Sequence, residues 1–337
     1  MGTLIRDMQG TDNKEDQKLQ RWLTHLADNW KDPAINAEFH ALAREISRQI
    51  MKEYSFYDIT PYIFVQTNLS RDTHKIVFRD LKGYTATTVS AGGRRQQFRL
   101  DKTRSVIWIP DEYDNATVEV YEEDLREGNY GSVADIRAGI RDALLHKKLA
   151  TVMEELHRIC NSTEDLAGTV TDGTAVSTTG AVGNQNYLYN PGSNLNKAAI
   201  DFAIRKVIGR TGRVVSIVGH PDYLLQIADL PGFIANREAI DDQRNQLQRR
   251  GWIGYYRGAN VVLVSEYYDE KYNKQVWDPY NIYIVGDGMA EIATLYGIEA
   301  VSDYDAMRSV RMIGADQKYV VLSQDPQLKR GFRIQMQ

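Results

Sequence analysis

A segment over residues 60–121 constrains the fold more than any other feature of the sequence. It holds five short runs rich in Val, Ile, Thr and aromatic residues, and we expect each to be a strand: YIFVQTNL, HKIVFRDL, YTATTVS, QQFRL and SVIWIP. SAGG at residues 90–93 suits a hairpin tip, because glycine accepts positive φ. Apolar residues are few between positions 71 and 104, and such a ribbon buries too little surface to be stable alone. The segment therefore needs another surface to lie on.

The charges around this ribbon form two adjacent blocks of opposite sign. Residues 71–104 hold nine cations and three anions, whereas residues 111–127 hold eight anions and one cation. A single run of charge is ordinarily a solvated face. Two neighbouring blocks can also pair, either within one chain or between a basic hairpin and an acidic patch on a neighbouring molecule.

Helical periodicity flanks the ribbon on both sides. Apolar residues recur at steps of three and four from Val133 to Cys160, which predicts one helix over residues 132–160, about 40 Å long and begun by Ser132 as N-cap. Residues 19–26 and 35–50 carry two earlier amphipathic stripes, separated by a break at Pro33. A helix as long as 132–160 is unusual in a globular domain and would act as a strut.

The C-terminal half predicts a compact αβ unit after a polar connection. Residues 162–196 are rich in Thr, Gly, Ser and Asn, which predicts a linker or irregular surface loop. NKAAIDFAIRKVIGR then predicts a helix, RVVSIVGH a buried strand and PDYLLQIADL a short helix with Pro221 at its start. ANVVLVS and NIYIVGD predict two more strands, and IEAVS, SVRMIGA, KYVVLS and RGFRIQM predict short strands joined by turns.

Composition excludes several classes of protein. The net charge of −4 disfavours a protein whose whole surface coats phosphate. Cys160 is the only cysteine, so no intrachain disulfide can form, in agreement with assembly in a reducing cytoplasm. The N-terminal residues lack an apolar signal core, and the chain has no apolar run of about 18 residues, so we expect neither export nor a membrane span.

No residue pattern predicts an enzyme, a cofactor or a metal site. His146 and His157 share the long helix but lie about 16 Å apart along its axis, too far to bind one metal ion. The glycines of GRTG (209–212) and GDG (286–288) are expected in turns, because neither sequence forms a nucleotide-binding or nucleophile motif. His220 follows a predicted strand, where α/β enzymes often place active-site residues, but we favour a helix-start hydrogen bond. An αβ enzyme that uses His220 and Asp222 stays open as an alternative.

The order of these parts resembles the major capsid protein of tailed double-stranded-DNA bacteriophages, whose α+β fold is the Hong Kong ninety-seven-type capsid fold. The runs RVVSIVGHPDYLLQIADL, ANVVLVSEYY and IYIVGDGMAEIATLYGIEA are similar to its axial-domain sequence. The resemblance covers nearly the whole chain. It implies an N-terminal helical arm at 1–59, an extended β-hairpin (the E-loop) at 60–110, a peripheral domain at 111–195 that includes the spine helix 132–160, a compact αβ axial domain at 196–300, and C-terminal strands at 301–337 that return to the peripheral and axial sheets.

The resemblance implies a non-enzymatic subunit of a virus particle. Copies would self-assemble into hexamers and pentamers of an icosahedral shell around the dsDNA genome. Further implied partners are portal and scaffolding or decoration proteins, with DNA contacted non-specifically at most and no membrane. The arm begins about sixty residues before the hairpin, so we expect a separate scaffold protein, or none, rather than a large scaffolding domain. Assembly is expected in the host bacterial cytoplasm, and the final location is the virion.

Charge complementarity and the resemblance together select the residues expected at the contact between subunits. The polar stretch at residues 236–250 is expected to line the central axis of a capsomer. The expected interface residues are the basic Arg94, Arg95 and Arg99 near the hairpin tip, and, as their acceptors, the acidic Asp111, Glu112, Glu122 and Glu123.

Two other self-assembling proteins stay open as alternatives. An encapsulin-like compartment has the same fold but houses a cargo enzyme, and a tail-tube or sheath protein assembles into helical tubes. The shape and the contents of purified particles would separate these possibilities.

Overall fold

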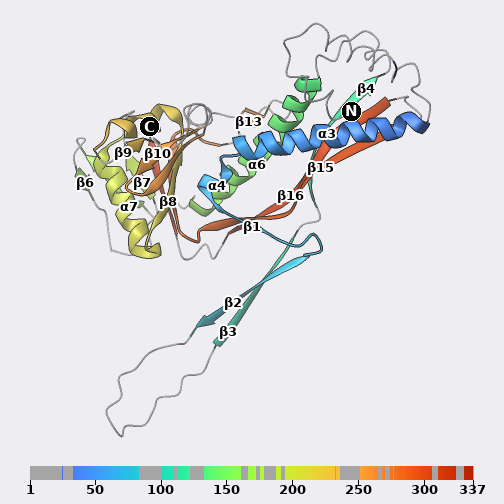
Figure 1. Ribbon diagram of the computed structural model, residues 1–337. Helices are drawn as coiled ribbons and strands as arrows, with labels where there is room; N and C mark the ends of the chain where they lie inside the picture. Colours follow the sequence, from blue (N-terminus) through green and yellow to red (C-terminus); the bar gives the residue numbers. More distant parts are fainter. Residues whose placement is uncertain are drawn as a thin grey trace.

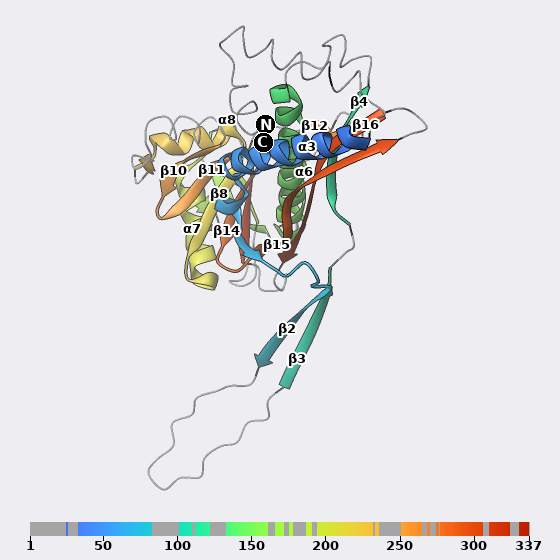
Figure 2. The same cartoon turned by 45° about the vertical axis from the view of Figure 1, so that its right-hand side comes forward.

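Two β-sheets and two long helices make up the body of the molecule, and a two-stranded hairpin projects from it (Figure 1, Figure 2). No helix in the part of the chain described is long and apolar enough to cross a membrane. The computed structural model describes residues 25, 33–82, 101–109, 112–121, 133–160, 166–171, 175–177, 187–190, 194–231, 233–235, 251–264, 268–269, 274–275, 277–305, 310–323 and 330–336.

A nine-stranded sheet forms one end of the body (Figure 1). Its strand order is β6-β5-β7-β17-β14-β8-β11-β10-β9. The two middle strands, β14 and β8, are almost wholly buried, as continuous apolar runs such as NIYIVG and VVSIVG predict. The strands are β5 (Leu166–Thr171), β6 (Ala175–Ser177), β7 (Tyr187–Asn190), β8 (Val214–Gly219), β9 (Phe233–Ala235), β10 (Trp252–Tyr256), β11 (Ala259–Leu263), β14 (Asn281–Gly286) and β17 (Gly331–Met336).

Helix α7 (Lys197–Thr211) packs on this sheet and confirms the helix predicted there. The Asn196 side chain accepts a hydrogen bond from the Ala198 amide at 2.8 Å and begins the helix. Gly212 ends it with φ of 83°, so this predicted turn glycine is confirmed. Gly209, also expected in a turn, instead lies within α7. After β8, the short helix α8 (Pro221–Leu224) and a 3₁₀ turn, η3 (Leu225–Asp229), confirm the helical run after Pro221.

The second sheet is four-stranded, in the order β1-β15-β16-β4. The expectation of short C-terminal strands is wrong here, because IEAVS is the end of β15, while SVRMIGA and KYVVLS belong to the single strand β16. The polar residues between those two runs stay in the ladder: Gln317 is buried and donates to the Leu144 carbonyl at 3.3 Å. The strands are β1 (Val65–Asn68), β4 (Asp114–Tyr121), β15 (Ala290–Asp305) and β16 (Val310–Ser323).

The body has two long helices, α3 (Pro33–Tyr57) and α6 (Val133–Cys160) (Figure 1). The spacing that predicts a helix over 132–160 is confirmed by α6, and the stripe over 35–50 is confirmed by α3. The first half of α6 shares a core with α3 and the four-stranded sheet, whereas its second half packs among residues of both sheets. The helix therefore joins the two sheets as a strut.

The segment YIFVQTNL was expected to be one strand. The structure instead shows a helical turn followed by a short strand. The first residues of this segment belong to helix α4 (Thr60–Ile63). Pro61 favours the start of a helix, and Asp58 accepts a hydrogen bond from the Thr60 amide at 2.9 Å. Only β1 continues as a strand, and it pairs in parallel with β15.

The polar connection over 162–196 also differs from the expected loop. It contributes β5, β6 and β7 to one edge of the nine-stranded sheet. The run YLYN could have predicted strand β7, because Leu188 and Asn190 are buried and alternate with less buried tyrosines. Its surroundings of Thr, Gly and Ser concealed that alternation.

Two glycines with positive φ give a matched test of local packing. Gly251 has φ of 120°, and a Cβ there would overlap the Leu263 carbonyl oxygen, whereas Gly258 has φ of 85° with open space around it. We expect Gly251→Ala to lower the free energy of unfolding by about 3 kcal/mol or more, and Gly258→Ala by about 1–2 kcal/mol, because only the second escapes the clash. Urea denaturation measures both, and equal losses would contradict the packing described.

Candidate functional site

The hairpin is a two-stranded ribbon formed by β2 (Lys75–Lys82) and β3 (Asp101–Trp108). The strands form eight antiparallel pairs, from Lys75 opposite Trp108 to Lys82 opposite Asp101. Among the described strands they pair only with each other, as does the small ribbon of β12 (Tyr268–Asp269) and β13 (Lys274–Gln275). Both views show β2 and β3 pointing away from the body (Figure 1, Figure 2). The ribbon therefore receives no strand partner from the described part of its own chain.

The root of the hairpin is fixed to the body and exposes a large aromatic ring. The Ile109 amide donates to the His74 carbonyl at 3.0 Å and closes the ribbon. Arg71 forms an ion pair with Glu299 of β15 at 3.1 Å. Trp108 is 70% exposed, with the Lys75 ammonium 5.7 Å from its ring centroid. An exposed tryptophan at a fixed position is typical of a protein contact rather than of a core.

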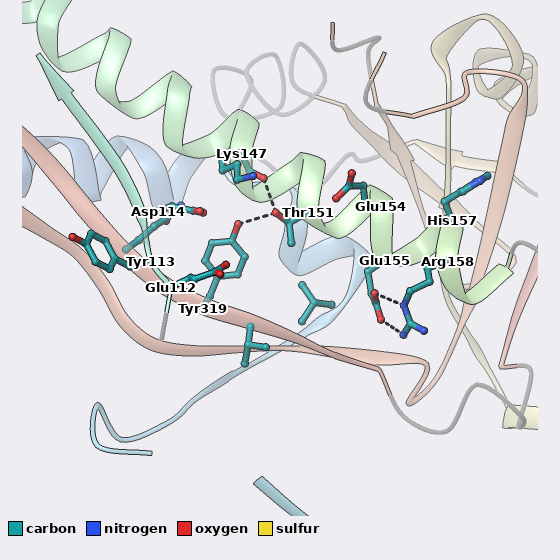
Figure 3. A pocket seen from close by; sticks show the side chains of 13 residues that line it. Glu112, Tyr113, Asp114, Lys147, Thr151, Glu154, Glu155, His157, Arg158 and Tyr319 are labelled. Carbon is teal, nitrogen blue, oxygen red and sulfur yellow. Dashed lines mark hydrogen bonds and ion pairs between the residues drawn. The ribbon is translucent and has the colours of Figure 1, made fainter. Parts of the chain in front are cut away.

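A groove of about 760 Å³ lies beside this root, between α6 and the strands β4 and β16 (Figure 3). We call it the acidic groove because acids outnumber bases among its charged residues. The wall from α6 presents residues at successive helical turns. The β16 floor consists of Gln317 and the consecutive residues Tyr319, Val320 and Val321. Its charged lining residues are Glu112, Asp114, Glu154 and Glu155 against Lys147 and Arg158, with His157 at one end.

Hydrogen bonds order the floor of the groove. The Tyr319 hydroxyl donates to Thr151 at 3.3 Å, and the Thr151 hydroxyl donates to the Lys147 carbonyl at 3.0 Å (Figure 3). Burial and the nearby Asp114 carboxylate raise the pKa of Tyr319 above its ordinary value, so the phenol stays protonated. Oδ2 of Asp114 is buried and accepts no hydrogen bond from the described residues.

The acids of the groove differ in how far they are neutralised within the chain. Glu155 is paired with Arg158, whose Nε donates at 2.8 Å. The structure gives no ion pair for Glu112, Asp114 or Glu154 among the described residues, and Lys147 is the one further cation of the lining. The groove therefore suits a cationic partner better than an anionic one.

His157 stands where the groove meets the nine-stranded sheet. Its Nδ1 lies 2.9 Å from the Tyr283 hydroxyl. Burial is the main cause that lowers the pKa of His157 from its ordinary 6.5, and the Arg333 guanidinium lowers it further, while Asp278 raises it. The folded protein therefore favours the neutral imidazole.

This preference predicts a loss of stability in mild acid. The unfolded chain binds a proton at His157 more readily than the folded chain, so the stabilisation is complete above pH 6.5 and is lost as pH falls through that value toward the lower folded pKa. We expect His157→Gln to flatten the pH dependence of the free energy of unfolding between pH 7 and 5. An unchanged slope in urea denaturation series would contradict this assignment.

The predicted interface residues are only partly within the described structure. Glu112 is exposed and lines the acidic groove. Asp114, Glu154 and Tyr319 also line the groove, although the sequence did not predict them as interface residues. Lys147, Thr151 and Glu154 are spaced by four and three residues, and this spacing of polar residues indicates one exposed face of the helix. The residues Arg94, Arg95, Arg99, Asp111, Glu122 and Glu123, and the stretch 236–250, lie outside the described residues.

The candidate enzymatic residues occupy structural positions. His220 Nδ1 accepts a hydrogen bond from the Asp222 amide at 3.3 Å at the start of α8, so the predicted helix-start role is confirmed. Gly288 has φ of 68° in the turn after β14, as expected for a turn glycine. Cys160 is buried, and burial raises its pKa to about 12, which keeps the thiol protonated. The described residues contain no group of three potential metal ligands.

No protein-family model and no curated protein matches the sequence. Solved structures do match. One from Mycobacterium phage Bobi has 12% identity and a TM-score of 0.51, over 81% of this chain and 88% of that chain. The capsid structure of cyanophage P-SCSP1u has 12% identity and a TM-score of 0.50, over 82% and 88%. One from Mycobacterium phage Adephagia has 11% identity and a TM-score of 0.50, over 81% and 88%.

These similarities extend over most of both chains, and they include a phage capsid. Identities near 12% carry information about the fold and not about individual residues. The chain has the Hong Kong ninety-seven-type α+β fold of phage capsid proteins.

Proposed function

We propose that this chain is a major capsid protein, which assembles into hexamers and pentamers of an icosahedral shell around the dsDNA genome of a tailed phage. The observation that carries the proposal is the projecting hairpin on a capsid fold. A two-stranded ribbon is marginally stable in water. A neighbouring subunit would supply the surface on which the hairpin of this chain lies.

The proposal divides the chain as the resemblance implies. Residues 1–59 are the N-terminal arm, 60–110 the E-loop, 111–195 the peripheral domain, 196–300 the axial domain and 301–337 the returning strands. The returning strands of this division are supported by β16 in the four-stranded sheet and β17 in the nine-stranded one, whereas β5, β6 and β7 lie in the nine-stranded sheet beside the strands of the proposed axial domain. The proposed intersubunit contacts join Arg94, Arg95 and Arg99 to acceptors among Asp111, Glu112, Glu122 and Glu123.

We propose a structural rather than a catalytic role. His220 is engaged as the cap of α8, and Asp222 beside it has an exposed side chain. The groove is lined by charged groups without a nucleophile held by a base. Turnover that is lost in His220→Ala with the fold intact would instead favour the αβ enzyme.

The proposed partners beyond a second copy are portal and scaffolding or decoration proteins. DNA would be contacted non-specifically at most, because the chain as a whole is mildly acidic. Shells would be assembled in the host bacterial cytoplasm and would become part of the virion.

Electron microscopy of the expressed protein tests the proposal. We expect closed, roughly spherical shells with fivefold and sixfold capsomers. Tubes would identify a tail-tube or sheath protein. If the protein formed no shells and no tubes, the proposal would lose its support. Particles purified from infected cells should contain DNA, whereas an enzyme inside them would identify the encapsulin-like compartment.

A further inference from the structure

The long strand β15 has two β-bulges beside the point where the chain leaves the body for the hairpin. Strand β1 pairs with β15 only as far as Thr294. Directly after that position, the register of β15 against β16 shifts between Thr294 and Tyr296, and it shifts again between Tyr296 and Glu299. Each shift inserts one extra residue into β15. Because side chains alternate with a period of two, the second bulge restores the alternation that the first disturbs, so the pair re-aims only this short stretch.

The second bulge brings the side chains of Tyr296 and Glu299 to one face of the sheet. In a regular strand, two residues that are three positions apart lie on opposite faces. Here Tyr296 lies opposite Lys318 and Glu299 lies opposite Asp316. Lys318 and Asp316 are two positions apart in β16 and therefore share a face. Tyr296 and Glu299 lie on that same face, which an unbulged strand would not allow.

Arg71, in the limb of the chain that enters the hairpin, contacts both re-aimed side chains. Its guanidinium lies 3.1 Å from Oε1 of Glu299 and 4.9 Å from the ring centroid of Tyr296. Burial and the Asp316 and Glu299 carboxylates raise the pKa of Tyr296, so the phenol stays neutral beside the cation. An ion pair and a cation–π contact therefore act on one guanidinium. We call Arg71, Tyr296 and Glu299 the root clamp.

Few other contacts hold this limb to the body. Its last backbone hydrogen bond to the sheet runs from the Leu69 amide to the Thr294 carbonyl, at 2.8 Å. The chain then turns, and the Thr73 amide donates to the Ser70 carbonyl at 3.0 Å. Within the described residues 70–74, Arg71 alone forms an ion pair or a ring contact with the body. The root clamp therefore limits how far this limb can swing beyond Leu69.

We infer that Arg71 is a positioning residue, held by Tyr296 and Glu299 so that the limb entering the hairpin leaves the body in one direction. The two bulges of β15 serve this role, because they present both partners on the face that Arg71 reaches. A segment that is already directed loses less conformational freedom when a second copy binds it. The direction of the limb is a property of the single subunit, and only its effect on assembly rests on the proposed function.

The distance between two spin labels in dilute, unassembled subunits measures this direction. The labels are attached to His74→Cys, at the exposed root, and to Asp222→Cys, on exposed α8. The native Cys160 is buried and is not expected to react with the label. We expect one narrow distribution of distances, which Arg71→Met widens about twofold because both contacts of the clamp are lost. Glu299→Gln keeps the ring contact and should widen it less.

A closely matched ion pair elsewhere supplies the control. Arg213 and Asp287 also lie 3.1 Å apart, with side chains about as exposed as those of Arg71 and Glu299. Arg213→Met should leave the distribution unchanged, and neither arginine variant should move the midpoint of urea unfolding much, because both pairs are exposed. A distribution that is equally narrow with and without Arg71, or that Arg213→Met widens as much, would overturn the inference.

The rate of assembly, followed by light scattering, separates this inference from the proposed function. We expect Arg71→Met to lower the initial rate about tenfold and Arg213→Met to leave it unchanged. A widened distribution with an unchanged rate would overturn the effect on assembly. Normal shells and an unchanged distribution in Arg71→Met would refute the clamp and leave the function standing. If the unmodified chain formed no shells while Arg71→Met widened the distribution, the function would fail and the clamp would stand.

Discussion

Replacing the hairpin by a short linker is expected to abolish assembly and leave the body folded. In this variant a Gly-Ser linker of about three residues takes the place of residues 76–107, which is feasible because Lys75 and Trp108 lie directly opposite each other. The described strands β2 and β3 pair only with each other, so their loss removes no strand from either sheet. The surface that binds the neighbouring copy disappears.

Sedimentation velocity and thermal unfolding check this prediction together. The variant should sediment as an unassembled subunit at concentrations at which the unmodified chain forms particles, with a melting temperature within about 2 °C of the unassembled chain. Assembly into normal particles would contradict the role of the hairpin. A large fall in melting temperature would show that the hairpin stabilises its own body.

Lys148→Met is expected to cause a large loss of stability, because it removes one partner of a buried ion pair. Lys148 Nζ lies 2.6 Å from Asp58 Oδ2, and both side chains are only 7% exposed. Asp58 also accepts bonds from the Thr60 amide and hydroxyl at 2.9 and 2.6 Å. Removal of the ammonium leaves a buried carboxylate without its counter-charge, at a cost of about 3–5 kcal/mol.

An exposed pair supplies the control for this prediction. Arg213 and Asp287 lie 3.1 Å apart with side chains 69% and 43% exposed, so Arg213→Met should cost less than about 1 kcal/mol. Urea denaturation of unassembled protein gives both values. Adding Asp58→Leu to Lys148→Met should recover part of the loss, because no charge then remains buried without a partner. Equal losses for the buried and the exposed pair would contradict the account.

The Lys148–Asp58 pair also shows how the body holds the hairpin. Asp58 lies directly before α4 and β1, and the chain enters the hairpin from β1. On the returning side, Asp114 begins β4 beside Tyr319, whose hydroxyl bonds to Thr151. Both limbs of the hairpin are therefore anchored to the same stretch of α6, around residues 147–151.

Much of the fold was predictable from local periodicity. The apolar spacing of α6 and α7, the buried run of β8 and the cap at His220 all follow from residues close together in the sequence. The long strands β15 and β16 could not be predicted in this way. Polar residues such as Gln317 suggest a turn, and only the folded structure shows that Gln317 is hydrogen-bonded to the Leu144 carbonyl. The strand β7 was concealed in the same way by the polar residues around it.

The contact between the hairpin and acidic residues stays a prediction. The opposite charge blocks predict that a basic hairpin pairs with acids, either within one chain or on a neighbouring molecule. The groove, however, combines Asp114, Glu154 and Tyr319 from three distant segments, and only the packing of α6 on the sheet brings them together.

Amide hydrogen exchange of the hairpin tests the central claim most directly, namely that this ribbon is stabilised by a second copy. The amides of residues 75–82 and 101–108 should exchange slowly in assembled particles. In dissociated subunits they should exchange close to the rate of an unstructured chain, while those of β8 and β14 stay protected. Equal protection of the hairpin in dilute monomer and in particles would contradict the claim.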